Sequence, residues 1–311
     1  MSASSRPAPH DILLGVSMIL ATAFAISVQD VVFKLFSSQM TLWQIFTLRG
    51  CLAVPALGAI AWVMHRRADR LRSAFGLWSV LRAVFITGTF LAFYAALPFL
   101  SLSVVGAANY TAPIFVALLS ACVIREPVGL LGWIGVIVGF AGVLVLLQPG
   151  SDAFSYWALL PVIGAVCYAL AHIITRVKCQ DVPVAGLSLA QNTVMLAAGL
   201  GVSLILVVAQ PDGELAQAYP YIFGGWSAVG LSDMLIILIL AGFAIALGMM
   251  LAGAYKVAPP SIVATFEYSY LVFVAVWDIL LFGFVPNLAT TGGMILIVVA
   301  GLLVLRGKPG S

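Results

Sequence analysis

Ten long apolar segments dominate this sequence and limit what it can fold into. Each has about the 20 residues that a helix needs to cross the hydrocarbon core of a bilayer. The segments are residues 12–35, 42–64, 74–97, 101–123, 129–147, 156–175, 184–209, 232–255, 260–283 and 287–305. Since helices satisfy their own backbone polar groups in lipid, the sequence predicts an all-α integral membrane protein with ten transmembrane helices.

The composition excludes the main soluble classes of protein. Of the 311 residues, 63% are hydrophobic and 8% are charged, whereas soluble domains have about 45–50% apolar and about 25% charged residues. A soluble enzyme, a nucleic-acid-binding domain and a disordered regulator are therefore excluded. The expected partners are membrane lipid and a small-molecule substrate, and not nucleic acid.

Basic residues lie on one side of the predicted helices. Of the 14 Lys and Arg residues, eleven lie outside the apolar segments, and all eleven fall on the side of the N-terminus when the segments alternate in direction. The charged residues of the opposite loops are acidic. Because basic loops are retained in the cytoplasm, both termini, including a tail of residues 1–11, are predicted to be cytoplasmic in a bacterial inner membrane.

An internal duplication divides the chain. At a shift of 158 residues, ANYTAPIFVALL aligns with FEYSYLVFVAVW, so that Tyr110 pairs with Tyr268. With one additional residue, AGVLVL matches AGLLVL further along. The sequence therefore predicts two five-helix halves, residues 12–149 and 156–306. Because five is an odd number, the second half is inverted relative to the first. Inverted repeats are typical of carriers with a midplane substrate site and alternating access.

Three segments carry a resemblance to a known family: FYAALPFLSLSVVGAANYTAPIFVALLS, REPVGLLGWIGVIVGFAGVLVLLQPG and AYKVAPPSIVATFEY. With the ten spans and the duplication, they make the chain similar to the ten-helix, EamA-type branch of the drug/metabolite transporter superfamily. The chain is most similar to the subgroup of riboflavin and S-adenosylmethionine uptake carriers. The resemblance implies a transporter of amino acids, vitamins, nucleoside-like metabolites or drugs. One departure is that the family's loop glutamate, Glu126 in the first half, has no counterpart in the second.

Charged residues inside the predicted spans are costly, so each is a candidate for function. Asp30 and Lys34 are four residues apart and share a helix face, and Arg49 lies at a similar depth in the second span. They form either a structural ion pair, with Asp30 bonded to Arg49 or Lys34, or an outer gate. Arg82 either extends to the cytoplasmic interface or lines the substrate cavity.

The ninth span has the most informative polar face. Glu267 and Asp278 are eleven residues apart and share this face, about 16 Å apart along the axis. Glu267 aligns with Asn109 of the first half. Glu267 is interpreted as a cation contact or proton carrier, or else as a helix–helix hydrogen-bond partner. Asp278 is either an outer-gate residue or a structural one.

Tyrosines near these polar residues form the rest of the candidate site. A buried tyrosine hydroxyl prefers a polar partner, so tyrosines in the middle of a span tend to face protein or water. Aromatic walls with one carboxylate suit a flat ring or an organic cation. The alternative for each tyrosine is packing or a place in the interfacial belt. The tyrosines in question are Tyr94, Tyr110, Tyr268 and Tyr270.

The sequence predicts a carrier rather than an enzyme. It contains no catalytic, nucleotide-binding or metal-binding motif, and no cofactor or metal ligand set is expected. An amino-acid or drug exporter of the same superfamily is the alternative function, and a lipid-modifying membrane enzyme is the alternative class. Gly135, Gly139 and Gly142 form a stripe of small residues that predicts close helix contact. This contact would lie within the chain or in a homodimer.

Overall fold

The computed structural model describes residues 9–36, 39–65, 73–119, 122, 129–148, 155–209, 213–257, 266 and 268–306. In these ranges all extended regular structure is helical, which confirms the predicted all-α class. The elements are α1 (Pro9–Phe36), α2 (Leu42–His65), α4 (Leu77–Ala96), α5 (Leu102–Asn109), α6 (Ala112–Leu119), α7 (Leu130–Leu147), η2 (Tyr156–Ala158), α8 (Leu159–Lys178), α9 (Val184–Ala209), α10 (Gly213–Ala218), α11 (Pro220–Phe223), α12 (Leu231–Val257), α14 (Ser269–Phe282) and α15 (Leu288–Arg306).

The chain is a multi-pass membrane protein. Within the described residues, six helices are long and apolar enough to cross a bilayer, and four shorter apolar helical segments accompany them. Large apolar side chains also cover the outside of the bundle; Val208, for example, is 77% exposed. Such extensive apolar surface is stable against lipid and not against water. The number of ten crossings stays a prediction.

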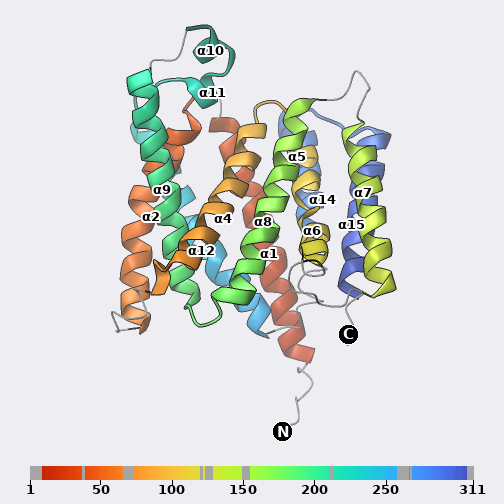
Figure 1. Cartoon of the computed structure of the whole chain (residues 1–311). Helices are drawn as coiled ribbons and strands as arrows, with labels where there is room; N and C mark the ends of the chain where they lie inside the picture. Colours follow the sequence, from red (N-terminus) through yellow and green to blue (C-terminus); the bar gives the residue numbers. More distant parts are fainter. Residues whose placement is uncertain are drawn as a thin grey trace.

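Helices from the two halves of the sequence pack against each other in pairs. α1 packs along α12, α2 along α9, α4 along α8, and α7 along α15. α14 packs against α1 and α5, while α5 and α6 pack against α8. Figure 1 shows the α7–α15 pair at one side of the bundle. The main buried core includes residues of α7 and α15 as well as of the other helices, and it is rich in aromatic and small residues.

The two ends of the bundle differ. α1 begins and α15 ends at the same end, which we call the terminal end (Figure 1). The short helices α10 and α11 lie at the opposite end, which we call the α10 end. Two termini on one side agree with an even number of crossings. Which end faces the cytoplasm stays a prediction.

Glycines allow α7 and α15 to approach closely. A Cβ atom placed on Gly142 would lie 2.9 Å from Leu296 Cβ and 3.1 Å from the Ile297 backbone nitrogen. A Cβ atom on Gly139 would meet both Ile114 of α6 and Ala300 of α15. Two glycines of the predicted stripe therefore make close helix contacts within the chain. A homodimer stays a prediction.

Replacing Gly142 with alanine should destabilise the protein, because the new methyl group would meet backbone and Cβ atoms that cannot turn away. We expect a loss of roughly 1–3 kcal/mol, as for other overpacked sites. Gly201→Ala in α9 is the matched control, because no atom lies within 4 Å of the added Cβ. Thermal unfolding in detergent would measure both variants. Equal melting temperatures would contradict the close α7–α15 contact.

Candidate functional site

Two helices end or begin at duplicated positions in the core. α5 ends at Asn109 and α6 begins at Ala112, so the helix is interrupted at Tyr110. In the other half α14 begins at Ser269, directly after Tyr268. The rings of Tyr110 and Tyr268 lie 5.6 Å apart. A break in a helix at a position that corresponds between two repeats indicates a transporter's binding site.

Tyr270 extends this pair into a small aromatic group. Its ring stacks on Tyr110 at 5.1 Å with an interplanar angle of 16°. Glycines provide the space for these rings. A Cβ atom on Gly106 would lie 2.8 Å from the Tyr270 ring, and one on Gly301 would collide with the Tyr268 hydroxyl. Backbone from α5 and α15 therefore lies directly against the predicted tyrosines.

Asp30 lies at the centre of a buried hydrogen-bond network. Its carboxylate accepts hydrogen bonds from the Tyr270 hydroxyl at 2.7 Å and from the Tyr94 hydroxyl at 3.2 Å. The Gln29 side-chain amide donates to the Tyr94 oxygen at 2.9 Å. Asp30 is only 3% exposed, and a buried carboxylate needs such donors to be tolerated. The network joins α1, α4 and α14.

Arg49 of α2 supplies a positive charge near this network. It is buried and interacts electrostatically with Asp30 and Tyr94. Its Nε and Nη1 atoms have no hydrogen-bond partner, and its guanidinium lies 6.0 Å from the Phe33 ring centre. Arg49 therefore acts on Asp30 through its nearby charge, while the two hydrogen bonds to the Asp30 carboxylate come from Tyr94 and Tyr270. We call Gln29, Asp30, Arg49, Tyr94 and Tyr270 the Asp30 cluster.

Lys34 and Asp278 support the turn between α4 and α5. The Lys34 ammonium donates hydrogen bonds to the carbonyl oxygens of Leu97 and Leu100. Asp278 is fully buried and accepts from the Leu102 amide at 3.0 Å and the Ser103 amide at 2.6 Å. A cation is favourable at the end of α4, and an anion at the start of α5.

Lys34 and Asp278 therefore bond to the main chain around the α4–α5 turn and are not members of the Asp30 cluster. Lys34 and Asp30 are four residues apart, but the hydrogen bonds described above direct the Lys34 ammonium to the α4–α5 turn. The geometry of Asp278 fits its structural interpretation. A gating role for either residue stays a prediction.

Arg82 and Asn109 make contacts with α8. The Arg82 Nε atom donates to the Thr175 hydroxyl at 2.8 Å. Arg82 precedes Tyr94 by twelve residues in α4, about 18 Å along the axis, and so lies towards the terminal end. The Asn109 Oδ1 atom is buried without a hydrogen-bond partner, and it lies 3.6 Å from the place that a Cβ atom on Gly164 would take. An unpartnered buried acceptor beside the helix interruption is available to a ligand.

Glu267 lies outside the described residues, so its predicted role stays a prediction. Sequence reasoning missed Gln29 and the two glycines that seat the tyrosines. The sequence could have indicated Gln29, because it is a second polar residue beside Asp30 in an apolar helix. It could not have singled out Gly106 and Gly301, because glycine is frequent along the whole chain.

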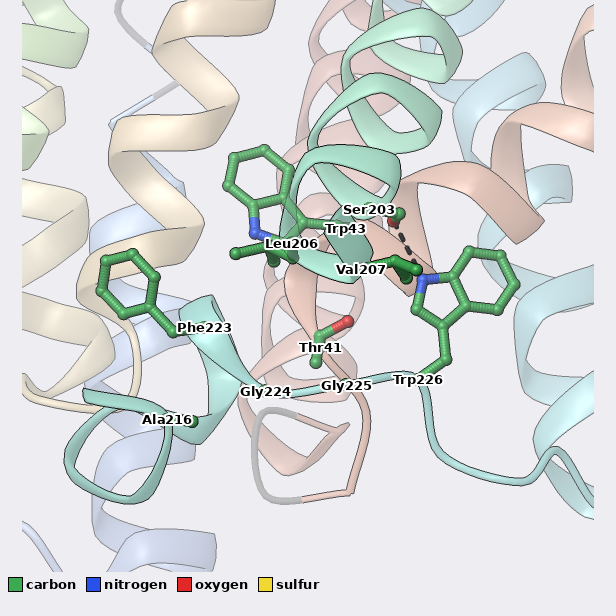
Figure 2. A pocket seen from close by; sticks show the side chains of 10 residues that line it. All are labelled: Thr41, Trp43, Ser203, Leu206, Val207, Ala216, Phe223, Gly224, Gly225 and Trp226. Atoms are coloured by element: carbon green, nitrogen blue, oxygen red, sulfur yellow. Dashed lines mark hydrogen bonds between the residues drawn. The ribbon is translucent and has the colours of Figure 1, made fainter. Parts of the chain in front are cut away.

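A separate hollow of about 230 Å³ lies at the α10 end. Figure 2 shows it between the start of α2, the end of α9 and the segment that follows α11. None of the predicted site residues lines it. In it the Trp226 indole nitrogen donates to the Ser203 hydroxyl at 2.9 Å.

The segment beside this hollow is bound to α2. The Gln44 side chain both donates to the Ser227 carbonyl oxygen at 2.8 Å and accepts from the Ser227 amide at 3.0 Å. The Trp43 indole donates to the Ile222 carbonyl oxygen at 2.8 Å. These three bonds fix residues 222–227, which we call the strap, on the end of α2.

Comparison with known proteins shows which family and which fold this chain is similar to. Residues 13–148 match the EamA-like transporter family. The resemblance to the drug/metabolite transporter superfamily is confirmed. A solved crystal structure with 16% sequence identity covers 94% of this chain and 96% of its own, with a TM-score of 0.56. At this identity the likeness shows a shared fold alone.

Curated relatives are named transporters. A riboflavin transporter of Vibrio cholerae is 28% identical over 57% of this chain, and one of Rhizobium johnstonii is 28% identical over 64%. The matches span only 53% and 60% of those two proteins. An S-adenosylmethionine uptake transporter of Rickettsia prowazekii is 20% identical over 96% of this chain and 95% of its own length.

Replacing Asp278 with alanine should destabilise the fold, because two buried amides at the start of α5 would lose their acceptor. We expect a loss of roughly 2–4 kcal/mol. Asp278→Asn should lose less, because its side-chain carbonyl still accepts one bond. Asp233→Ala is the control, since Asp233 accepts only the exposed Gly230 amide. Thermal unfolding would rank the three variants. Equal losses of stability for Asp278→Ala and Asp233→Ala would show that the buried bonds to Asp278 add no more to the stability of the fold than an exposed bond does.

Proposed function

We propose that this protein is a secondary transporter that moves a small organic metabolite across a bacterial inner membrane by alternating access. The observation that carries the proposal is the contact between Tyr110, at the break between α5 and α6, and Tyr268, directly before α14. A break in a helix exposes backbone groups and is stable in a membrane only where protein or a cavity satisfies them. The two tyrosines also lie where the two proposed repeats meet.

The pairing of helices supports two inverted five-helix repeats, residues 12–149 and 156–306. In the proposed repeats α1 corresponds to α8, as the first span of each half, and α4 corresponds to α12, as the third. The α1–α12 contact therefore corresponds to the α8–α4 contact. The α14–α1 contact corresponds to that of α5 and α6 with α8, and the α2–α9 and α7–α15 contacts map onto themselves. A pseudo-two-fold axis in the membrane plane requires this correspondence. The basic loops favour cytoplasmic termini.

The proposed substrate class is a metabolite with a flat heteroaromatic ring. Tyr110 and Tyr270 already stack on each other, with Tyr268 alongside, so a planar ring would find parallel aromatic faces. Aromatic side chains bind planar rings through offset stacking and through apolar area. The curated relatives named for riboflavin and S-adenosylmethionine agree with this class. Asn109 and Glu267 are the proposed polar contacts, and no covalent chemistry is required.

Alanine at Tyr110 or Tyr268 should weaken binding about tenfold, because each variant removes one aromatic face worth about 1 kcal/mol or more. Purified protein would be titrated with riboflavin and with S-adenosylmethionine, and binding followed by thermal shift and by exchange in liposomes. Tyr156→Ala is the matched control, because Tyr156 is 80% exposed and outside the site. An equal effect in all three variants would remove the tyrosines from the site. Absence of saturable exchange with both compounds would overturn the substrate class.

Glu267→Gln tests the predicted carboxylate separately. The substitution keeps the shape of the side chain and removes its charge, so transport should fall at least about tenfold, the effect of losing one charge-assisted contact. Thermal unfolding should be unchanged. Normal transport by this variant would exclude Glu267 from the site.

A further inference from the structure

We infer that Asp30 is a proton-binding site, and that its protonation controls a hydrogen bond between the two halves of the molecule. The chemical step is small: a proton from water adds to one carboxylate oxygen, and no other covalent bond changes. Its consequence for transport rests on the proposed function. The site itself rests on the geometry of the Asp30 cluster.

The position of Asp30 is the first argument. Its carboxylate receives one hydrogen bond from Tyr94 of the first half and a shorter one from Tyr270 of the second half. In the described part of the chain no backbone amide donates to it. An ionised carboxylate accepts both bonds, whereas a protonated one has a donor in place of one acceptor. Protonation therefore weakens the tyrosine bonds, because the acceptor loses its charge, and it adds a donor that needs an acceptor of its own.

The cluster also contains an acceptor for the new donor. Gln29 Oε1 is buried and has no hydrogen-bond partner, while the Nε2 atom of the same amide donates to Tyr94. A rotation of this amide would let Tyr94 donate to Gln29 and accept from protonated Asp30. The Gln29 amide then exchanges its bond as a donor to Tyr94 for a bond as an acceptor from Tyr94, so the cluster takes up the proton without losing a hydrogen bond.

The charges around Asp30 favour a proton over a metal cation. Arg49 of α2 is buried nearby, and its positive charge would repel a metal ion at the carboxylate. Lys34 on α1 is bound to the α4–α5 turn, and Arg82 on α4 is bound to Thr175. Asp278 on α14 is bound to the α5 amides. The charged residues of α12 are Asp233 and Lys256, at its two ends.

Tyr270 connects this site to the proposed substrate site. Its hydroxyl bonds to Asp30, while its ring stacks on Tyr110. A change in the Asp30–Tyr270 bond would therefore reach the aromatic group directly. In the ionised state the bond ties α14 to α1. Protonation removes the charge that strengthens this bond, so the tie between α14 and α1 becomes weaker and α14 can move relative to α1.

Infrared titration of the purified full-length protein, without substrate, tests the site directly. On acidification, the unsubstituted protein and the Glu267→Gln control should share one carbonyl band of a protonated buried carboxylic acid, and this band should be missing from Asp30→Asn whatever Glu267 and Asp278 contribute. Asp30→Glu should restore a titrating band at a shifted position, which guards against misfolding as the cause of the loss. Identical titrations of the unsubstituted protein and Asp30→Asn would overturn the inference.

Transport in liposomes tests the coupling, with riboflavin and S-adenosylmethionine as probes. If one proton accompanies each substrate, an inward gradient of one pH unit supports about tenfold accumulation. The ratio of accumulation with and without the gradient should fall to about 1 in Asp30→Asn, since no proton then moves with the substrate. Accumulation driven by sodium instead would overturn proton coupling. Absence of transport of both probes would count against the proposed function, while the infrared titration still decides the Asp30 site.

Discussion

The hydrogen bonds from the Leu102 and Ser103 amides to Asp278 are the interaction on which the centre of this structure depends. In lipid the first amides of a helix have no water to bond to, so a helix can begin there only beside an acceptor. Asp278 lies 175 residues away in sequence from Ser103 and comes from the other half. Because these bonds position α5, they also position Asn109 and Tyr110 at its end.

Small residues determine where the large ones can lie. Tyr270 occupies space next to Gly106, and the hydroxyl of Tyr268 occupies space next to Gly301. A methyl group at either glycine would displace its neighbouring tyrosine and with it the contact of that ring with Tyr110. The polar cluster and the aromatic group are thus held by contacts with backbone as much as by contacts between side chains. Rigid neighbours of this kind keep a binding site in shape before its ligand arrives.

The sequence predicted the helices well and the side-chain partners less well. Apolar length located the long helices, but it gave residues 101–123 as one segment, which the structure divides into α5 and α6, and it gave no sign of α10 and α11. The duplication brought Tyr110 and Tyr268 to corresponding places, and the structure places their rings in contact. The spacing of Asp30 and Lys34 correctly allows one shared face, yet Lys34 bonds to carbonyl oxygens of another helix end. Periodicity describes one helix at a time, so a partner 63 or 240 residues away, as for Lys34 and Asp30, is invisible to it.

The strap at the α10 end has a consequence for how this connection is specified. Gln44 and Trp43 hold it through the main-chain atoms of Ser227 and Ile222. Every residue offers the same carbonyl, and every residue except proline the same amide. The Ser227 hydroxyl adds one side-chain bond to the same Gln44 oxygen at 3.2 Å. The attachment therefore depends mainly on the path of the main chain. Substitutions at Phe223 or Trp226 would change the adjoining hollow and leave these bonds to α2 in place.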